Sequence, residues 1–225
     1  LSDNALIKTK KFRDPKYIGD PINAVRIFNE KSVDELFIAD IKISRENKSP
    51  NFDLIGKISQ ECRMPICYGG GIKSVKDIEK IINLGVEKVS ISSSFLDDPH
   101  LISKAASKFG SQSIAVCLDV KKSRFRKNYA LYFNNGKNIS NKDLFLSIKE
   151  LESLGAGELI INAIDKEGMM DGYDLELCEK ISSFTNLPIT FLGGAGSLED
   201  FKDLWKTCGM VGAAAGSFFV FKGKF

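Results

Sequence analysis

Two parts of the chain carry the residue types that bind phosphate groups. The first glycine–serine site combines Gly69-Gly70-Gly71 with Ser92-Ser93, and the second combines Gly193-Gly194-Ala195-Gly196 with Gly216-Ser217. Glycine lets backbone N–H groups approach an anion closely, and serine hydroxyls add donors. A single glycine-rich stretch is more often a tight turn without a ligand. Two equivalent stretches in one chain favour a substrate with a phosphate group at each end.

Two aspartates are candidates for chemistry because each follows an apolar run. Asp119 follows Ile114–Leu118, and Asp40 follows Phe37–Ala39. At the carboxyl end of a buried parallel strand, an acid faces the active mouth and suits general acid–base work. The alternative is an acid that caps the next turn. Lys8, near the start of the sequence, is placed to cover an anionic substrate, and a solvated lysine is an equal alternative.

Three charged residues stand at the opposite ends of apolar runs. They are Glu35, Lys88 and Glu158, each directly before a predicted strand. In a barrel these residues would gather at the floor, where a buried charge must be paired. The pattern is typical of a structural ring of salt bridges, or of a gate on an axial passage.

The elements that must position these residues repeat within the chain. Residues 69–95 and 193–219 align, so that Gly69 matches Gly193 and Ser93 matches Ser217. Each copy reads as a glycine turn, an amphipathic helix, a short strand of small residues and a serine-bearing turn. Ser74 and Ser197 precede the two helices as caps. Internal repetition of this kind indicates a duplicated half.

Short apolar runs alternate with amphipathic stretches throughout the sequence. The runs predict strands at Glu35–Ile41, Met64–Tyr68, Lys88–Ser92, Ile114–Val120, Glu158–Ala163, Pro188–Leu192 and Val211–Ala215. Helices are predicted at Pro21–Lys31, Asp53–Cys62, Val75–Leu84, Asp143–Leu154, Asp174–Phe184 and Leu198–Thr207. The runs are continuous rather than alternating, as in a parallel sheet buried on both faces.

This alternation and the internal repeat predict an α/β fold, a (β/α)₈ TIM barrel with twofold duplication. We expect one domain over residues 1–225, with halves of about 1–110 and 111–225. Residues Leu1–Lys11 read as a polar loop, so the first strand is expected before Leu1 and the last helix after Phe225. A doubly wound open sheet is the alternative, but it would not require the second half to copy the first.

One segment departs from the alternation. Residues Phe125–Asn141 contain Asn134-Asn135-Gly136, which predicts the turn of a small inserted hairpin. The basic run Lys121–Lys127 before it favours a solvated loop, or one that attracts an anionic substrate, over a nucleic-acid site.

Composition excludes several classes of function. The 225 residues are 43% hydrophobic and 27% charged with a net charge of +3, and they contain no run of about 18 apolar residues. No signal-peptide pattern is visible at the start of this sequence, so we expect none. Five cysteines without CxxC spacing indicate reduced thiols in a cytoplasmic protein. The single histidine, His100, lies in a predicted turn and argues against His-based triads and multi-histidine metal sites. We expect no metal, cofactor, nucleic acid or membrane.

A set of short motifs, in this order, resembles HisF, the cyclase subunit of imidazole glycerol phosphate synthase, over essentially the whole chain. The matching motifs are Gly19-Asp20-Pro21, Asp34-Glu35-Leu36, Gly69-Gly70-Gly71-Ile72, Glu87-Lys88-Val89-Ser90-Ile91, Phe109-Gly110-Ser111-Gln112, Leu118-Asp119, Gly155-Ala156-Gly157-Glu158, Asp171-Gly172-Tyr173-Asp174 and Gly193-Gly194-Ala195-Gly196.

The resemblance implies a (β/α)₈ barrel and a lyase of histidine biosynthesis that works with a HisH-like glutaminase subunit. Ammonia from the partner would enter at the barrel floor, cross the core and meet a bis-phosphorylated ribulosyl-aminoimidazole substrate. The products would be imidazole glycerol phosphate and AICAR. No cofactor is implied.

The resemblance also assigns roles to individual residues. Asp119 matches the second catalytic aspartate, and Lys8 matches the loop lysine that closes over substrate. The positions matching phosphate or substrate contacts are Asp40, Gly71, Ser92, Ser93, Glu167, Gly168, Gly194, Gly216 and Ser217. Three of the four gate charges are matched by Glu35, Lys88 and Glu158. The first catalytic aspartate would lie immediately before Leu1.

Several positions depart from the family pattern. The family usually has Asn at Ser92, Asp at Glu167, Thr at Met169 and Ser at Leu192. Apolar side chains in place of hydroxyls indicate a different or absent cyclase substrate. These departures, Asn162 and the segment Lys8–Ala24 resemble HisF-like paralogues of surface-polysaccharide, lipopolysaccharide-type gene clusters. Such paralogues are thought to conduct ammonia to an amidotransferase that makes acetamidino sugars.

Three hypotheses about function therefore stay open: a cyclase, a sugar-amidination paralogue, and a non-enzymatic barrel that conducts ammonia and acts as a scaffold. A related isomerase of the same duplicated-barrel group is disfavoured, because it would give the charges at Glu35, Lys88 and Glu158 no task.

Overall fold

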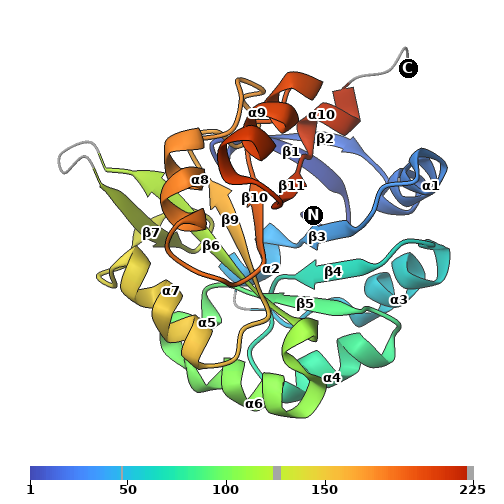
Figure 1. The fold of residues 1–225 in the computed structure, drawn as a ribbon. Coiled ribbons are helices and arrows are strands. Elements are labelled where there is room, and N and C mark those ends of the chain that lie inside the picture. Colours follow the sequence, from blue (N-terminus) through green and yellow to red (C-terminus); the bar gives the residue numbers. More distant parts are fainter. Residues whose placement is uncertain (47, 124–127, 222–225) are drawn as a thin grey trace. The chain divides into compact units, whose positions relative to one another are not determined.

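The computed structural model describes residues 1–46, 48–123 and 128–221 (Figure 1). It divides into two compact units of similar size. Unit 1 comprises Leu1–Ile7, Lys16–Val116 and Leu154–Gly157, and unit 2 comprises Lys8–Pro15, Cys117–Ser153 and Glu158–Phe225. The prediction of one domain with halves at 1–110 and 111–225 stays a prediction.

Unit 1 is a parallel sheet with helices between its strands. Its elements are α1 (Pro21–Lys31), β3 (Leu36–Ala39), α2 (Ile41–Arg45), α3 (Phe52–Glu61), β4 (Ile66–Gly69), α4 (Val75–Asn83), β5 (Lys88–Ile91), α5 (Ser94–Asp97), α6 (His100–Phe109), η1 (Ser111–Ser113) and the start of β6 (Ile114–Lys122). The strands pair in the order β3, β4, β5, β6, all parallel. Figure 1 shows α3, α4 and α6 along one side of these strands.

Local sequence explains where the helices of unit 1 begin. Asp20 accepts a hydrogen bond from the backbone N–H of Asn23 and is followed by Pro21, whose fixed φ suits the first turn. Ser74 caps α4 in the same way, as predicted. The apolar faces of the helices bury Ile58, Ile78 and Ile102 against the sheet, and this burial is the main source of their stability.

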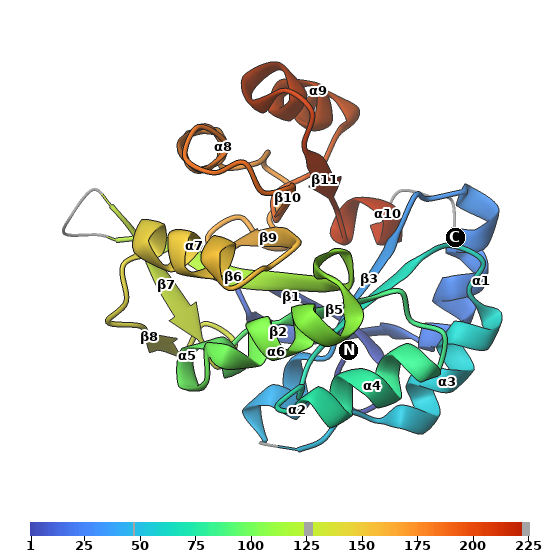
Figure 2. The same cartoon turned by 60° about the horizontal axis from the view of Figure 1, so that its bottom comes forward.

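Unit 2 repeats the parallel arrangement and adds an antiparallel hairpin. Its elements are the remainder of β6, β7 (Tyr129–Phe133), β8 (Asn138–Ile139), α7 (Leu144–Ser153), β9 (Glu158–Ala163), α8 (Leu175–Ser182), β10 (Ile189–Leu192), α9 (Leu198–Cys208), β11 (Gly212–Ala214) and α10 (Ser217–Phe221). The strand order is β6, β9, β10, β11, with β7 on β6. Figure 2 shows the same elements from a second direction.

The inserted hairpin is confirmed. Asn134, Asn135 and Gly136 all have positive φ angles, of 52°, 58° and 72°, and they connect β7 to β8. Asparagine and glycine tolerate this left-handed backbone better than other residues. Of the basic run, Lys121 and Lys122 belong to β6, and residues 124–127 lie outside the described residues.

The expected polar loop at Leu1–Lys11 was wrong. Residues Leu6–Lys10 form β1, which pairs with β2 (Arg13–Gly19) in a separate two-stranded sheet. Lys11 and Phe12 form the two-residue turn, with φ angles of 51° and 61°. Two positive φ values suit a tight hairpin, but the usual Asn-Gly signal is missing from the sequence. His100 was also misplaced, since it opens α6 rather than lying in a turn.

The internal repeat is present as repeated structure. After β4, the chain forms a glycine turn, α4, β5 and the short helix α5, and after β10 it forms a glycine turn, α9, β11 and α10. Ser197 caps α9 with a complete capping box that includes Asp200. No helix in the described parts of the chain is long and apolar enough to cross a membrane.

Candidate functional site

Asp119 lies within β6 of unit 2 and faces Asn162 on the neighbouring strand β9. The amide Nδ2 of Asn162 donates a hydrogen bond of 3.0 Å to Oδ1 of Asp119. Burial raises the pKa of Asp119 to about 7, the Asn162 hydrogen bond opposes this shift, and the nearby charge of Glu167 adds to it. Asp119 is half-buried. A carboxyl that titrates near neutral pH and is reachable by a ligand suits general acid–base catalysis.

Glu167 links the loop after β9 to the hairpin that carries Lys8. The hydroxyl of Thr9 donates to Oε2 of Glu167 at 2.9 Å, and the backbone N–H of Lys11 donates to the carbonyl of Glu167 at 2.9 Å. Burial raises the pKa of Glu167, while Thr9 and the positive charge of Lys8 oppose the shift. Four residues predicted from the sequence therefore lie in one part of unit 2: Lys8, Asp119, Glu167 and Gly168.

Asp40 in unit 1 is buried, and its side chain caps α2. Its Oδ1 accepts from the backbone N–H of Ile43 at 3.5 Å, and its own N–H donates to the carbonyl of Gly69 at 2.7 Å. Burial raises the pKa of this carboxyl. The capping interpretation that the sequence left open accounts for the position of Asp40. Its predicted contact with substrate stays a prediction.

Three of the predicted glycines are required by close packing within the protein. A Cβ atom on Gly71 would lie 2.3 Å from Cγ2 of Ile43, one on Gly168 would lie 2.0 Å from the carbonyl oxygen of Thr9, and one on Gly194 would lie 2.1 Å from that of Gly172. All three also have positive φ angles. Their glycine identity is therefore explained by backbone contacts alone.

Gly216 differs from these three glycines. Among the described residues, no atom lies within 4 Å of the position that its Cβ would occupy, and its φ lies outside the left-handed region. Neither packing nor backbone strain explains a glycine there. A bound anion would need open space beside the backbone at Gly216. The next residue, Ser217, has a hydroxyl that could donate to such an anion.

The serine turns lie at corresponding places in the two copies. In unit 1, the carbonyls of Ser92 and Ser93 accept hydrogen bonds from Phe95 and Leu96 as α5 begins. In unit 2, Ser217 opens α10 and the carbonyl of Gly216 accepts from Phe219. The hydroxyl of Ser94 donates to the carbonyl of Ile72, which joins the two parts of the first glycine–serine site. Ser94 was not predicted, although it stands in the same serine run.

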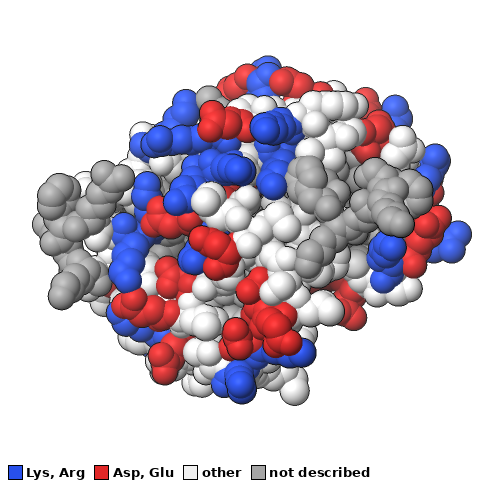
Figure 3. Space-filling view, turned by 90° about the horizontal axis from the view of Figure 1, so that it is seen from above, with Lys and Arg blue, Asp and Glu red and all other residues white. Residues whose placement is uncertain are grey.

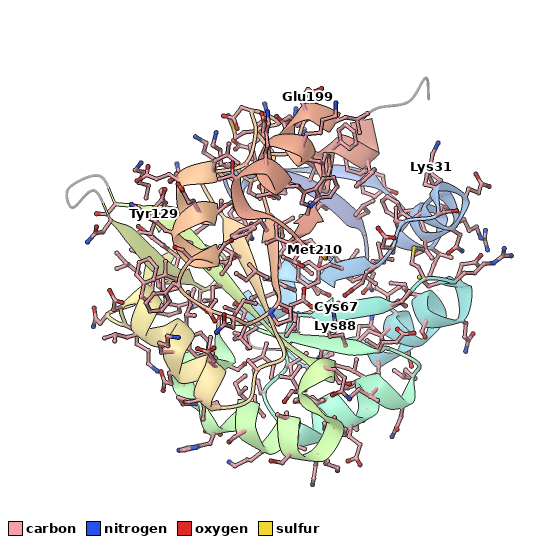
Figure 4. The ribbon with its side chains drawn as sticks, in the orientation of Figure 1. Lys31, Cys67, Lys88, Tyr129, Glu199 and Met210 are labelled. Atoms are coloured by element: carbon pink, nitrogen blue, oxygen red, sulfur yellow. The ribbon has the colours of Figure 1, made fainter. Side chains whose placement is uncertain are left out.

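The charged residues at the starts of the strands have partners inside their own unit. Nζ of Lys88 lies 3.0 Å from Oε2 of Glu35, and Lys88 stands beside Cys67 at the start of β5 (Figure 4). In unit 2, Oε1 of Glu158 accepts a 2.6 Å hydrogen bond from the hydroxyl of Thr190 on β10. Thr190 was not predicted, because a threonine inside a strand is usually chosen for its β-branched shape.

The surface shows a mixture of charges. Basic side chains lie beside acidic ones over the face in Figure 3. Ion pairs with exposed side chains include Lys180–Glu176 and Lys202–Glu199. Among the described residues, no three His, Cys, Asp or Glu side chains gather in a way that would hold a metal ion.

The amino-acid sequence matches one family model and many known proteins. Residues 3–225 match the model described as "Histidine biosynthesis protein". The chain is 49% identical to the "Putative imidazole glycerol phosphate synthase subunit HisF" of Leptospira borgpetersenii over 223 residues, which cover 99% of this chain and 88% of the relative. It is 48% identical to the "Putative imidazole glycerol phosphate synthase subunit hisF3" of Vibrio vulnificus, over 100% of this chain and 86% of the relative.

A more distant relative carries the name without that qualifier. The imidazole glycerol phosphate synthase subunit HisF of Hydrogenobaculum sp. is 37% identical over 222 residues, or 99% of this chain and 88% of the relative. The resemblance to HisF is thereby confirmed over nearly the whole sequence. With its parallel strand–helix alternation, the chain belongs to the histidine biosynthesis protein family, as a HisF-like member with the (β/α)₈ barrel fold of that family.

Proposed function

We propose that this chain is the ammonia-using subunit of an imidazole glycerol phosphate synthase. On this proposal it cyclises a bis-phosphorylated ribulosyl-aminoimidazole to imidazole glycerol phosphate and AICAR. The observation that carries the proposal is Asp119, whose pKa of about 7 lets it accept and return a proton at neutral pH. The names of the HisF relatives support the same reaction.

The chemistry requires a base because attack by ammonia on a carbonyl carbon leaves the nitrogen with a proton to lose. Asp119 in its carboxylate form takes that proton, and in its acid form it returns a proton to an oxygen that leaves as water. Lys8 acts electrostatically on Glu167, which its neighbour Thr9 contacts, and in the proposal its charge attracts the anionic substrate.

In the proposal, each glycine–serine site binds a phosphate group. In unit 2, Gly216 and Ser217 supply backbone N–H groups and a hydroxyl, and in unit 1 the predicted phosphate contacts are Ser92 and Ser93. The open space beside Gly216 supports the first assignment. Asp40, Gly71, Gly168 and Gly194 shape the surrounding turns, and Glu167 positions the hairpin of Lys8.

The proposed partner is a glutaminase subunit that releases ammonia. Channelling protects the nitrogen, because ammonia in bulk water is protonated and then has no lone pair for attack. Lys88 and Glu35 in unit 1 stand at the amino ends of strands and are proposed to control ammonia entry, and the same role is proposed for Glu158 in unit 2. The buried Cys178 has a free thiol, which is in keeping with a reducing compartment, and we place the reaction in the cytoplasm.

The test is a cyclase assay on the protein with ammonium salt as nitrogen source and the bis-phosphorylated ribulosyl-aminoimidazole as substrate. Wild-type protein should form imidazole glycerol phosphate, and Asp119→Asn should not. Asp203→Asn, an exposed carboxyl on α9, is the matched control and should retain wild-type turnover. A wild-type protein without product would overturn the proposal.

Two side chains favour a second candidate, a paralogue that conducts ammonia to an amidotransferase making acetamidino sugars. Met169 is 36% exposed in the loop after β9, and Leu192 ends β10, so both put apolar groups near the proposed mouth. This candidate predicts no cyclase product from the wild type. It also predicts that Met169→Thr with Leu192→Ser would gain cyclase turnover.

A further inference from the structure

Asn162 carries a buried oxygen atom that the protein leaves without a partner. The residue is 7% exposed on β9, and its Nδ2 is committed to Asp119 at 3.0 Å. Among the described residues, no group donates a hydrogen bond to its Oδ1, which is buried. Buried carbonyl oxygens nearly always accept a hydrogen bond, so this one points to a donor supplied from outside the chain.

The surroundings explain why the protein does not satisfy this oxygen itself. Leu192 stands opposite Asn162 in the register of β10 and has no donor in its side chain. On the other side, Asp119 accepts from the amide and has no proton to offer while ionised. The Thr9 hydroxyl, a possible donor elsewhere in unit 2, is used on Glu167.

We propose that Oδ1 of Asn162 binds an N–H group of ammonia and so positions the nitrogen for reaction beside Asp119. The inference rests on the proposed ammonia-dependent function and assigns its nitrogen donor a specific atom of this chain. The ligand class is a small neutral amine, because a neutral amide oxygen accepts from N–H without adding charge. The Asp119 contact fixes the amide plane, so the direction of Oδ1 is set before ammonia arrives.

Asp119 accepts and then returns the one proton that moves in this step, so the step balances. The ammonia lone pair forms a C–N bond to the ketone carbon of the substrate, and the C=O π pair moves to oxygen. One N–H proton passes to the Asp119 carboxylate, while Asn162 holds a second N–H. Asp119 then gives its proton to the new alkoxide, which leaves a carbinolamine and restores the carboxylate. Asn162 is a positioning residue in this scheme, since it transfers no proton.

The first test is kinetic and uses ammonium salt as the nitrogen source. Asn162→Leu removes the acceptor at similar size and should raise the KM for ammonia by about tenfold, since about that factor corresponds to one lost hydrogen bond. The KM for the bis-phosphorylated substrate should stay near the wild-type value. Asn162→Thr keeps a group that can both donate to Asp119 and accept from ammonia, and it should recover most of the ammonia affinity.

Ser182→Ala is the matched control. Ser182 on α8 also has a buried oxygen for which the structure gives no partner, but it lies outside the proposed site. The control should leave both KM values unchanged. An unchanged ammonia KM in Asn162→Leu, or an equal rise of both KM values, would overturn the proposal.

The second test does not depend on turnover and separates the inference from the proposed cyclase function. The side-chain amide signal of Asn162 is followed by ¹⁵N NMR while ammonium chloride is added at a pH where free ammonia is present, with sodium chloride as salt control. A saturable shift of the Asn162 amide signal supports binding even if no cyclase product forms, provided that the other asparagines do not show it and sodium chloride does not cause it. The Asn162→Thr spectrum identifies the Asn162 signal, because that signal is missing from it. No shift in the wild type contradicts it even if the enzyme is active.

Discussion

The hydroxyl of Thr9 donates a 2.9 Å hydrogen bond to Glu167, a residue 158 positions further along the chain. The neighbouring Gly168 packs so closely on the carbonyl of Thr9 that a side chain there would collide with it. Together these contacts hold the hairpin of β1 and β2 against the loop after β9. Lys8, the neighbour of Thr9 in β1, is therefore placed by the fold, close enough to Glu167 for its charge to oppose the raised pKa of that carboxyl, instead of belonging to an unattached loop.

Removing the Thr9 hydroxyl should loosen this attachment. Thr9→Val keeps the shape but leaves the half-buried Glu167 carboxylate without one donor, so the free energy of unfolding should fall by about 1 kcal/mol. Less precise placement of Lys8 should raise the KM for the bis-phosphorylated substrate more than it lowers kcat. Chemical denaturation and steady-state kinetics measure the two effects.

Thr207→Val is the control for this change, because the Thr207 hydroxyl donates to the carbonyl of Asp203 on an exposed face of α9. It should alter neither KM nor stability appreciably. If Thr9→Val changed stability alone and left the KM unaltered, the hairpin attachment would have no role in substrate binding.

The two kinds of glycine in the candidate site should respond differently to alanine. Gly71→Ala should destabilise the protein by about 2–3 kcal/mol, because its Cβ would overlap Ile43 and its φ of 68° is strained for alanine. Gly216→Ala meets no described atom and should leave the melting temperature unchanged. It should instead weaken binding of the phosphorylated substrate.

Thermal melts and substrate titrations by calorimetry distinguish the two outcomes. Gly209→Ala is a useful further variant, since Gly209 also has open space but a φ of 73°, so strain alone should destabilise it without affecting binding. A Gly216→Ala protein that binds substrate normally would remove Gly216 from the proposed phosphate site.

The raised pKa of Asp119 predicts how activity depends on pH. As general base it must be ionised, and its pKa is about 7. The value of kcat/KM, expressed per free ammonia, should rise through pH 7 and then level off. Asn162→Leu should move the midpoint upward, because the Asn162 hydrogen bond favours the ionised form. A profile that is flat between pH 6 and 8 would exclude Asp119 as the titrating base.

The same shift predicts an effect on stability. The folded-state pKa is raised above the ordinary value of 3.8, so the unfolding free energy falls as the pH rises from about 4 through 7. Asp119→Asn lacks this titration and should become the more stable protein above neutral pH, by about 1–2 kcal/mol. Denaturation curves of both proteins at pH 5 and pH 8 measure the difference. A difference that does not grow with pH would contradict the shift.

The sequence predicted the elements well where one physical signal dominated. Helix α1 has the predicted bounds, and Asp20 and Pro21 mark its start. Five of the seven parallel strands fall within the apolar runs, while β4 extends one residue and β6 two residues beyond theirs. The β1–β2 hairpin was missed because Lys11 and Phe12 adopt positive φ angles that their side chains do not favour. Tertiary contacts to Glu167 support that turn, and such contacts leave no local pattern.

The sequence predicted which residues belong to the candidate site, but not which residues form hydrogen bonds with them. Asp119 was identified from its position after an apolar run and from a family motif, and Glu167 from the resemblance to HisF alone. The partners Asn162, Thr9 and Thr190 come from other strands. Asn162 was noted only as a feature shared with the paralogues, and the contacts of all three follow from the folded arrangement. The pKa of Asp119 depends on burial and on those partners, so it follows only from the folded arrangement.

The Lys88–Glu35 pair gives a test of the proposed ammonia entrance. Lys88 is the more buried partner, at 19% side-chain exposure against 38% for Glu35, and their contact distance is 3.0 Å. Lys88→Met keeps the aliphatic stem but removes the charge, and an exposed pair of this kind contributes less than about 1 kcal/mol to stability. Turnover with glutamine and the glutaminase partner should fall severalfold, while turnover with ammonium salt should stay near wild type. Lys108→Met, which breaks the surface pair with Glu79 at 2.8 Å, should change neither rate. Equal loss of both activities in Lys88→Met would mean that the pair supports the fold and does not control ammonia entry.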